Sequence, residues 1–145
     1  MPLVRALYFS RARADLPFWQ TVSEIVGGSA LRNGRDELTG LLVAQDGWFV
    51  QVLEGSAPRV SRLLFAIAQD RRHSEMQLVD FRAADARLFG QWSMAHAAIT
   101  PAVFPLLQRL GLRPDDFDPR GLKADDMLTL LTEVRSAAET HRLSA

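Results

Sequence analysis

Short apolar runs separated by polar clusters predict five strands in the first 99 residues. Each run is rich in aromatic and branched side chains and ends at polar residues, which is typical of strands. Between the second and third runs, the Asp46-Gly47 pair supplies the backbone conformation that a tight hairpin turn needs. The predicted strands cover residues 3–9, 38–44, 48–54, 77–81 and 92–99.

Two stretches with helical periodicity lie between these strands. The first follows Asp15, a candidate N-cap, and repeats apolar side chains at three- and four-residue steps to about Leu31. The second begins after Ser56, carries its apolar side chains on one face, and ends near residues 70–74. This order of elements is the split βαβ pattern, so we expect an α+β fold: a ferredoxin-like βαββαββ sheet with the two helices on one face.

Apolar side chains recur at helical spacing in two further stretches after residue 99. One covers residues 101–111 and the other residues 127–138, with an acidic linker between them. Each apolar stripe needs a partner surface, and the sheet face that the first two helices leave bare is the nearest one. We therefore expect residues 1–99 to form one domain, and residues 100–145 to form a helical extension packed on the other sheet face.

Composition limits the chemistry that this chain of 145 residues can carry. It has 17 basic and 17 acidic residues and no net charge, so charge-driven binding to nucleic acid is not expected. The absence of cysteine excludes disulfides, thiolate metal sites and light chemistry through a cysteinyl adduct. Apolar runs reach only six residues, too short for a membrane span, so we expect a cytoplasmic protein. The histidines lack metal-ligand spacing, and no metal is expected.

Two polar side chains stand out within the predicted strands. Gln51 shares its strand face with Phe49 and Leu53, and Tyr8 lies between Leu7 and Phe9. A buried amide without a partner costs about 1–3 kcal/mol, so Gln51 needs a hydrogen bond. The first and third strands of a split βαβ sheet are neighbours, which allows a Tyr8–Gln51 hydrogen bond on the face that the helices cover. The alternative is a satisfied polar pair with no role beyond the core.

The predicted helices on that face offer two apolar walls with polar groups at one end. An isoalloxazine ring has flat apolar faces that isoleucines can sandwich, and a pyrimidine edge that amides can match. Each residue of these walls, considered alone, is also explained as a core residue, a helix cap or a residue at a helix C-terminus. The candidate lining residues are Ile25, Ser29, Asn33, Ile67, Asp70, Arg72 and His73.

Residues 2–97 resemble the BLUF domains, a family of blue-light sensors that use FAD. The match is a set of short motifs in the same order and at similar gaps. They are Tyr8-x-Ser10, Ser29 with Asn33, Thr39-Gly40-Leu41-Leu42, Phe49 to Gly55, Asp70-Arg71-Arg72-His73, and Phe89 to Met94.

The resemblance implies a photochemical role for two of these residues. Tyr8 is then the electron and proton donor to the excited flavin, and Gln51 lies between Tyr8 and the flavin N5 and C4 carbonyl. Asn33 is expected to hold the pyrimidine edge, and Ile25 and Ile67 to sandwich the ring.

The remaining expectations from the resemblance concern the lining and the output. Asp70, Arg72 and His73 line the cofactor, which is FAD or, alternatively, FMN. Trp92 and Met94 are expected to relay the signal. The chain resembles a short, stand-alone member that is not an enzyme, forms a homodimer or larger homo-oligomer, and signals to a separate protein partner. Arg32 departs from the family pattern, in which many members carry Asn or His before the flavin-binding asparagine.

Two rival functions remain open from the sequence. A ferredoxin-like scaffold also supports small enzymes, such as an acyl-phosphate hydrolase or a heme-degrading dimer. Such an enzyme needs a phosphate-binding nest or a heme-ligating histidine, and the sequence presents neither pattern. The other rival is an interaction domain without a cofactor, which would be colourless when purified.

Overall fold

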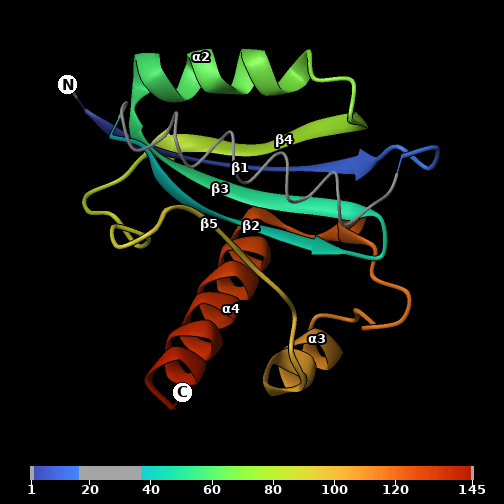
Figure 1. The fold of residues 1–145 in the computed structure, drawn as a ribbon. Coiled ribbons are helices and arrows are strands. Elements are labelled where there is room, and N and C mark those ends of the chain that lie inside the picture. Colours follow the sequence, from blue (N-terminus) through green and yellow to red (C-terminus); the bar gives the residue numbers. More distant parts are fainter. Residues whose placement is uncertain (1, 17–36, 145) are drawn as a thin grey trace.

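The structure, a computed structural model, describes residues 2–16 and 37–144 (Figure 1). The helix predicted up to Leu31 therefore lies outside the described residues. Within them, the predicted ferredoxin-like α+β class is confirmed. The elements are β1 (Leu3–Ala12), β2 (Thr39–Gln45), β3 (Trp48–Ser56), α2 (Ala57–Ala68), β4 (His73–Ala83), β5 (Ser93–Ala97), a 3-10 turn (Pro101–Val103), α3 (Phe104–Arg109), a second 3-10 turn (Pro119–Gly121) and α4 (Ala124–Ser144).

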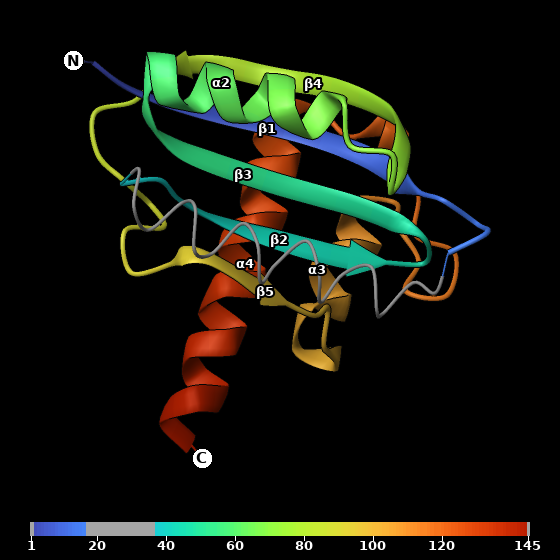
Figure 2. The ribbon, with the colours of Figure 1, turned by 45° about the horizontal axis from the view of Figure 1, so that its top comes forward.

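The five strands form one sheet in the order β4-β1-β3-β2-β5. β1 pairs antiparallel with β3 and β4, β2 pairs antiparallel with β3, and β5 runs parallel to β2 at the edge of the sheet (Figure 2). The β2–β3 hairpin closes at the predicted turn, where Asp46 and Gly47 have φ values of 51° and 81°. These are the left-handed conformations that a two-residue hairpin loop requires.

Several element boundaries differ from the prediction because neighbouring strands extend them. β1 does not end at Phe9 but continues to Ala12, since Ser10 and Arg11 pair with β3 despite their polarity. In the same way β4 covers His73–Ala83 rather than residues 77–81. β5 is shorter than predicted, which leaves Trp92 ahead of the strand, and α2 ends at Ala68. Main-chain pairing with a neighbouring strand thus outweighs the local propensity of these residues.

One face of the sheet packs against α2. Val60, Leu63 and Leu64 of α2 are buried in a cluster with Ala6 of β1 and Leu53 of β3. Pro58 stands in the first turn of the helix, where its missing N–H leaves no hydrogen bond unmade. Tyr8 belongs to the same cluster, so the helix covers the face of the sheet on which the Tyr8 side chain lies.

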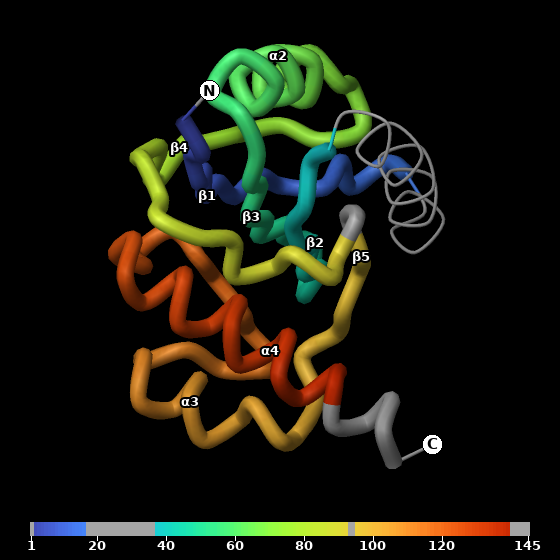
Figure 3. The backbone as a smooth tube through the Cα atoms, turned by 90° about the vertical axis from the view of Figure 1, so that its left-hand side faces the viewer, coloured from blue at the N-terminus to red at the C-terminus, as the bar shows by residue number. Residues whose placement is uncertain are grey.

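The opposite face packs against the two C-terminal helices, so that the described chain has three layers (Figure 3). Leu107 of α3 and Leu130 of α4 are fully buried in the same cluster as Leu7, Val50 and Val52 of the sheet. Burying these apolar stripes removes them from water, which supplies most of the packing free energy. No helix among the described residues is long and apolar enough to cross a membrane.

Candidate photosensory site

The centre of the candidate site is a buried pair of polar side chains on adjacent strands. Tyr8 of β1 lies directly opposite Gln51 of β3, and the Tyr8 hydroxyl donates a hydrogen bond to Oε1 of Gln51. Tyr8 is 3% exposed and Gln51 is 1% exposed. The strands place the pair here because β1 and β3 are the central neighbours of a split βαβ sheet. The neighbourhood expected from the sequence is therefore present in the fold.

The surroundings keep the Tyr8 phenol neutral. Burial disfavours the phenolate and raises the pKa of Tyr8 well above its ordinary value, and the negative charge of Asp70 raises it further. A neutral phenol remains a hydrogen-bond donor, as the bond from the Tyr8 hydroxyl to Gln51 requires. The same observation places the Asp70 carboxylate within electrostatic reach of Tyr8.

Three polar residues after the end of α2 form a compact cluster. The Asp70 carboxylate accepts hydrogen bonds from the Arg72 backbone N–H and from Arg72 Nε, both at 2.9 Å. The Arg72 guanidinium thereby holds the pKa of Asp70 below its usual value. His73 is buried, its Nε2 lies 2.5 Å from the carbonyl oxygen of Ile67, and its ring meets the edge of Phe49. The predicted site residues Ile67, Asp70, Arg72 and His73 are thus brought together.

The other predicted lining residues belong to the first helix. Ile25, Ser29 and Asn33, together with the divergent Arg32, lie outside the described residues. The side chain of Met94 also lies outside what the structure describes, although its backbone forms part of β5.

Trp92 lies on the opposite side of the sheet from Tyr8. Its indole is 5% exposed and is buried in the cluster that the sheet shares with α3 and α4. The indole Nε1 donates a hydrogen bond to Oε1 of Glu139 in α4 at 3.3 Å. Trp92 therefore contacts the C-terminal helix α4.

Strand register connects the Tyr8–Gln51 pair to β5. Leu42 of β2 lies opposite Gln51 of β3, and on its other side Leu42 lies beside His96 of β5. The backbone of Gly40 also donates a hydrogen bond to the Trp92 carbonyl oxygen at 2.9 Å. A single strand thus separates Gln51 from the segment that leads to the C-terminal helices.

Glu54 is a buried carboxylate that the sequence reasoning missed. It is 0% exposed and accepts hydrogen bonds from Arg5 Nε at 3.0 Å and Thr39 Oγ1 at 3.1 Å. It also accepts the backbone N–H groups of Leu88 at 2.8 Å and Phe89 at 2.9 Å. Glu54 therefore ties the end of β3 to the connection that precedes Trp92. A charged residue within an otherwise apolar strand was the available signal in the sequence.

Ser10 is a second buried polar residue for which the sequence reasoning proposed no role. It is 0% exposed, and its hydroxyl forms no hydrogen bond within the described part of the chain. It lies two residues after Tyr8 on β1, and its partner across the strands is Phe49.

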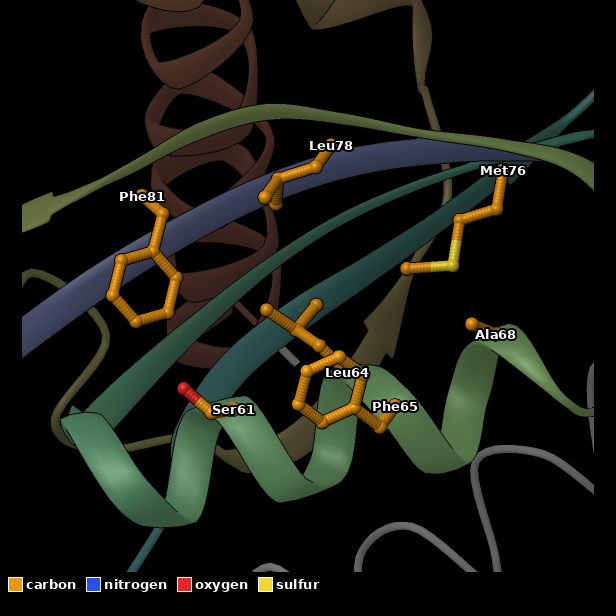
Figure 4. Close-up of a pocket in the computed structure, with 7 residues that line it drawn as sticks. All are labelled: Ser61, Leu64, Phe65, Ala68, Met76, Leu78 and Phe81. Atoms are coloured by element: carbon orange, nitrogen blue, oxygen red, sulfur yellow. The ribbon is translucent and has the colours of Figure 1, made fainter.

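An apolar hollow lies between α2 and β4, apart from the Tyr8–Gln51 pair (Figure 4). Its volume is about 480 Å³, and Phe65, Leu78 and Phe81 on its walls are partly exposed. Among its lining residues, only Ser61 has a side-chain donor or acceptor of the kind that would match the polar edge of a flavin. The Tyr8–Gln51 pair supplies polar groups of that kind, which the walls of this hollow lack apart from Ser61.

Comparison with known proteins identifies the family of this chain. The family model BLUF, described as sensors of blue-light using FAD, matches residues 3–95. The chain belongs to the BLUF family, whose cofactor is a flavin.

Two relatives that match part of this chain are light-regulated proteins. The chain is 34% identical over 92 residues to the blue light- and temperature-regulated antirepressor BluF of Escherichia coli, covering 63% of this chain and 23% of that protein. It is 33% identical over 108 residues to the photoactivated adenylate cyclase subunit beta-like protein FB of Euglena gracilis, covering 73% of this chain and 12% of that protein. The chain thus spans less than a quarter of the length of either relative.

Solved structures match over nearly the whole chain. The photo-activated state of BlsA superposes with a TM-score of 0.83 at 25% identity, covering 91% of this chain and 94% of that chain. The dark state of BlrB, a BLUF protein, superposes with a TM-score of 0.75 at 29% identity, covering 94% and 97%. These two likenesses extend past residue 95 and so include much of the C-terminal helical region.

Proposed function

We propose that this chain is a blue-light photoreceptor that binds FAD noncovalently, with FMN as the alternative, and signals to a separate protein rather than catalysing a reaction. The observation that carries the proposal is the buried hydrogen bond between Tyr8 and Gln51. It supports this function because the two side chains form an electron and proton donor coupled to an amide that can rearrange. The partners of this chain are then the flavin, further copies of the chain and a downstream protein, without nucleic acid or membrane.

The residues present fit a flavin. Gln51 and Asn33 would hold its polar edge, and Ile25 and Ile67 would pack on its two faces. Ser29, Asp70, Arg72 and His73 would complete the lining. The Arg72 guanidinium is already paired with the Asp70 carboxylate, so the two side chains together present little net charge to a bound ligand.

The proposed light reaction uses Tyr8 and Gln51. A bound flavin, when excited, supplies an electron acceptor. Neutral Tyr8 gives up an electron from its ring and a proton from its hydroxyl, and Gln51 lies in the path of the proton. Both return to Tyr8, so that no net oxidation or covalent bond remains. The lasting change is the hydrogen bonding of Gln51, which leaves the photocycle reversible.

The signal is proposed to leave through β5. Gln51 lies across Leu42 from His96, so that a changed hydrogen-bond network at Gln51 acts on a strand directly paired to β5. Trp92, ahead of β5, then passes the change to α4 through its hydrogen bond to Glu139, with Met94 as a second relay residue. Couplings of this kind are typically worth about 1–3 kcal/mol.

The proposed function predicts the spectrum of the purified protein. The protein is expected to be yellow, and blue light should shift its flavin absorption slightly to the red, with full reversal in darkness. The shift is small because only hydrogen bonding to the flavin changes. Absorption spectra before, during and after illumination test this. Bleaching of the main flavin band would refute the light reaction, and a colourless protein that fails to bind added FAD or FMN would refute the function.

The proposed route predicts that light alters protection of the C-terminal helices. Amide hydrogen exchange in α3 and α4 should differ between dark and illuminated protein, because the docking of Leu106 and Leu130 on the sheet responds to β5. Met94→Ala should reduce this difference while the red shift persists. The light-insensitive Tyr8→Phe variant serves as the control. Equal protection in darkness and light, with a normal red shift, would exclude these helices as the output.

A further inference from the structure

Ser10 presents a buried hydroxyl that the described protein does not satisfy. The side chain is 0% exposed, and its oxygen has no hydrogen-bond partner in the described residues. Most buried side-chain polar atoms in folded proteins are hydrogen-bonded, and each exception calls for an explanation. A serine hydroxyl can donate one hydrogen bond and accept others, so a missing ligand is one such explanation.

The strand geometry places this hydroxyl on the face of the sheet that carries Tyr8. Side chains two residues apart on a strand share a face, and Ser10 follows Tyr8 by two residues in a part of β1 that pairs with β3 without irregularity. Its cross-strand partner Phe49 belongs to the same buried cluster as Tyr8 and α2. Along the strand, Ala12 then pairs with His73 of β4. Ser10 thus lies between the Tyr8–Gln51 pair and His73.

We propose that the Ser10 hydroxyl is a further flavin-binding group, which donates a hydrogen bond to an acceptor atom of the bound flavin. This inference rests on the proposed function, since it assumes a flavin on this face of the sheet. A flavin offers acceptors of one kind of chemistry in two places: the carbonyl oxygens and nitrogens of the ring, and the hydroxyls of the ribityl chain. A hydrogen bond to an acceptor in either place would satisfy the Ser10 hydroxyl.

A purely structural role for Ser10 predicts different behaviour. A small polar residue packed in the core would stabilise the fold with or without flavin, and its loss would lower stability equally in both conditions. A ligand-binding hydroxyl is unsatisfied until the flavin arrives. Removing it should leave the flavin-free fold at least as stable and reduce only the stabilisation that the flavin adds.

The test compares Ser10→Ala with Ser74→Ala, a matched control in which the replaced serine is exposed on β4. Flavin affinity of the full chain is measured by the fluorescence of flavin released on dilution, and thermal unfolding is followed over a range of FAD concentrations. Loss of one ordinary hydrogen bond should weaken FAD binding about fivefold in Ser10→Ala and leave Ser74→Ala unchanged. The unfolding midpoint of Ser10→Ala without added FAD should equal or exceed that of the wild type.

A second variant and a second ligand make the test more specific. Ser10→Cys nearly keeps the side-chain volume but replaces the hydroxyl by a weak donor, and it decides the question if Ser10→Ala does not fold. Binding of lumiflavin, which lacks the ribityl chain and everything attached to it, separates the ring from the rest of FAD. An equal loss of affinity for lumiflavin and FAD assigns the contact to the ring, and a loss for FAD alone assigns it to the ribityl chain or the phosphates.

Unchanged affinity for both flavins, or a fall in stability that is the same with and without FAD, would overturn the inference about Ser10 and leave the proposed function intact. Failure of the wild type to bind any flavin would overturn both.

Discussion

Tyr8→Phe and Gln51→Leu are each expected to abolish the light-induced red shift completely while the protein stays folded and retains its flavin. Phenylalanine lacks the hydroxyl that supplies the proton, and leucine lacks the amide that rearranges. Both substitutions nearly conserve volume, so the packing of the cluster beneath α2 survives. Absorption spectra of the flavin-loaded variants in darkness and under blue light provide the measurement.

A control variant separates this role from a general effect of losing a hydrogen-bonded amide in the sheet. Gln45 lies on the neighbouring strand β2, and its amide Nε2 donates a hydrogen bond to the Pro114 carbonyl oxygen at 2.7 Å. Gln45→Leu should therefore keep the full red shift. A normal red shift in Tyr8→Phe or in Gln51→Leu would show that the photochemistry involves other residues.

The pair also makes a prediction about stability. Each single variant removes the buried Tyr8–Gln51 hydrogen bond, at a cost of about 1–3 kcal/mol in the free energy of unfolding. The double variant removes both polar groups, so its loss of stability should be smaller than the sum of the two single losses. Additive losses would mean that the hydrogen bond contributes nothing to the folded state.

The largest effect on stability is expected from Glu54. Replacing Glu54 by alanine should lower the free energy of unfolding by about 3–5 kcal/mol, because the change leaves the Arg5 guanidinium without its carboxylate partner and the N–H groups of Leu88 and Phe89 unsatisfied. Arg5 is only 14% exposed, so water replaces the lost carboxylate poorly. Urea unfolding of the variant and the wild type measures this difference in the free energy of unfolding, provided that both depend on urea concentration with the same slope.

The control for Glu54 is an exposed ion pair in the same chain. Asp115 lies 3.5 Å from Arg113, and both side chains are 73% exposed. Asp115→Ala should change the free energy of unfolding by less than about 0.5 kcal/mol, since water screens such pairs. If Glu54→Ala were as mild as this control, the carboxylate would not hold the connection between β4 and β5 in place.

The network around Glu54 also reaches the C-terminal helix α4. The connection that it holds carries Leu88, whose carbonyl oxygen accepts a hydrogen bond from Arg135 of α4, and it leads directly to Trp92. The end of β3, three residues after Gln51, is therefore anchored to the segment that contacts the C-terminal helix. Glu54 therefore fixes the position of the connection that leads into β5.

The sequence by itself determined the elements whose signals are local. Short apolar runs bounded by polar clusters predicted the central strands, and Asp46-Gly47 predicted the hairpin turn, because a two-residue loop depends on its own backbone conformations. The split βαβ order then brought Tyr8 and Gln51 together, since the topology alone makes their strands neighbours. Helical periodicity likewise indicated α2 and the C-terminal helices, although not their ends.

Only the tertiary structure decided the features that depend on distant segments meeting. Glu54 resembles a solvated carboxylate in the sequence, and it becomes a buried anchor only when residues 5, 39, 88 and 89 converge on it. Ser10 looked like the end of a strand, but pairing with β3 carried the strand past it and buried its hydroxyl. Trp92 lies against α4 because the C-terminal helices occupy the opposite sheet face. Their positions follow from contacts across the sheet, and periodicity within one segment carries no information about such contacts.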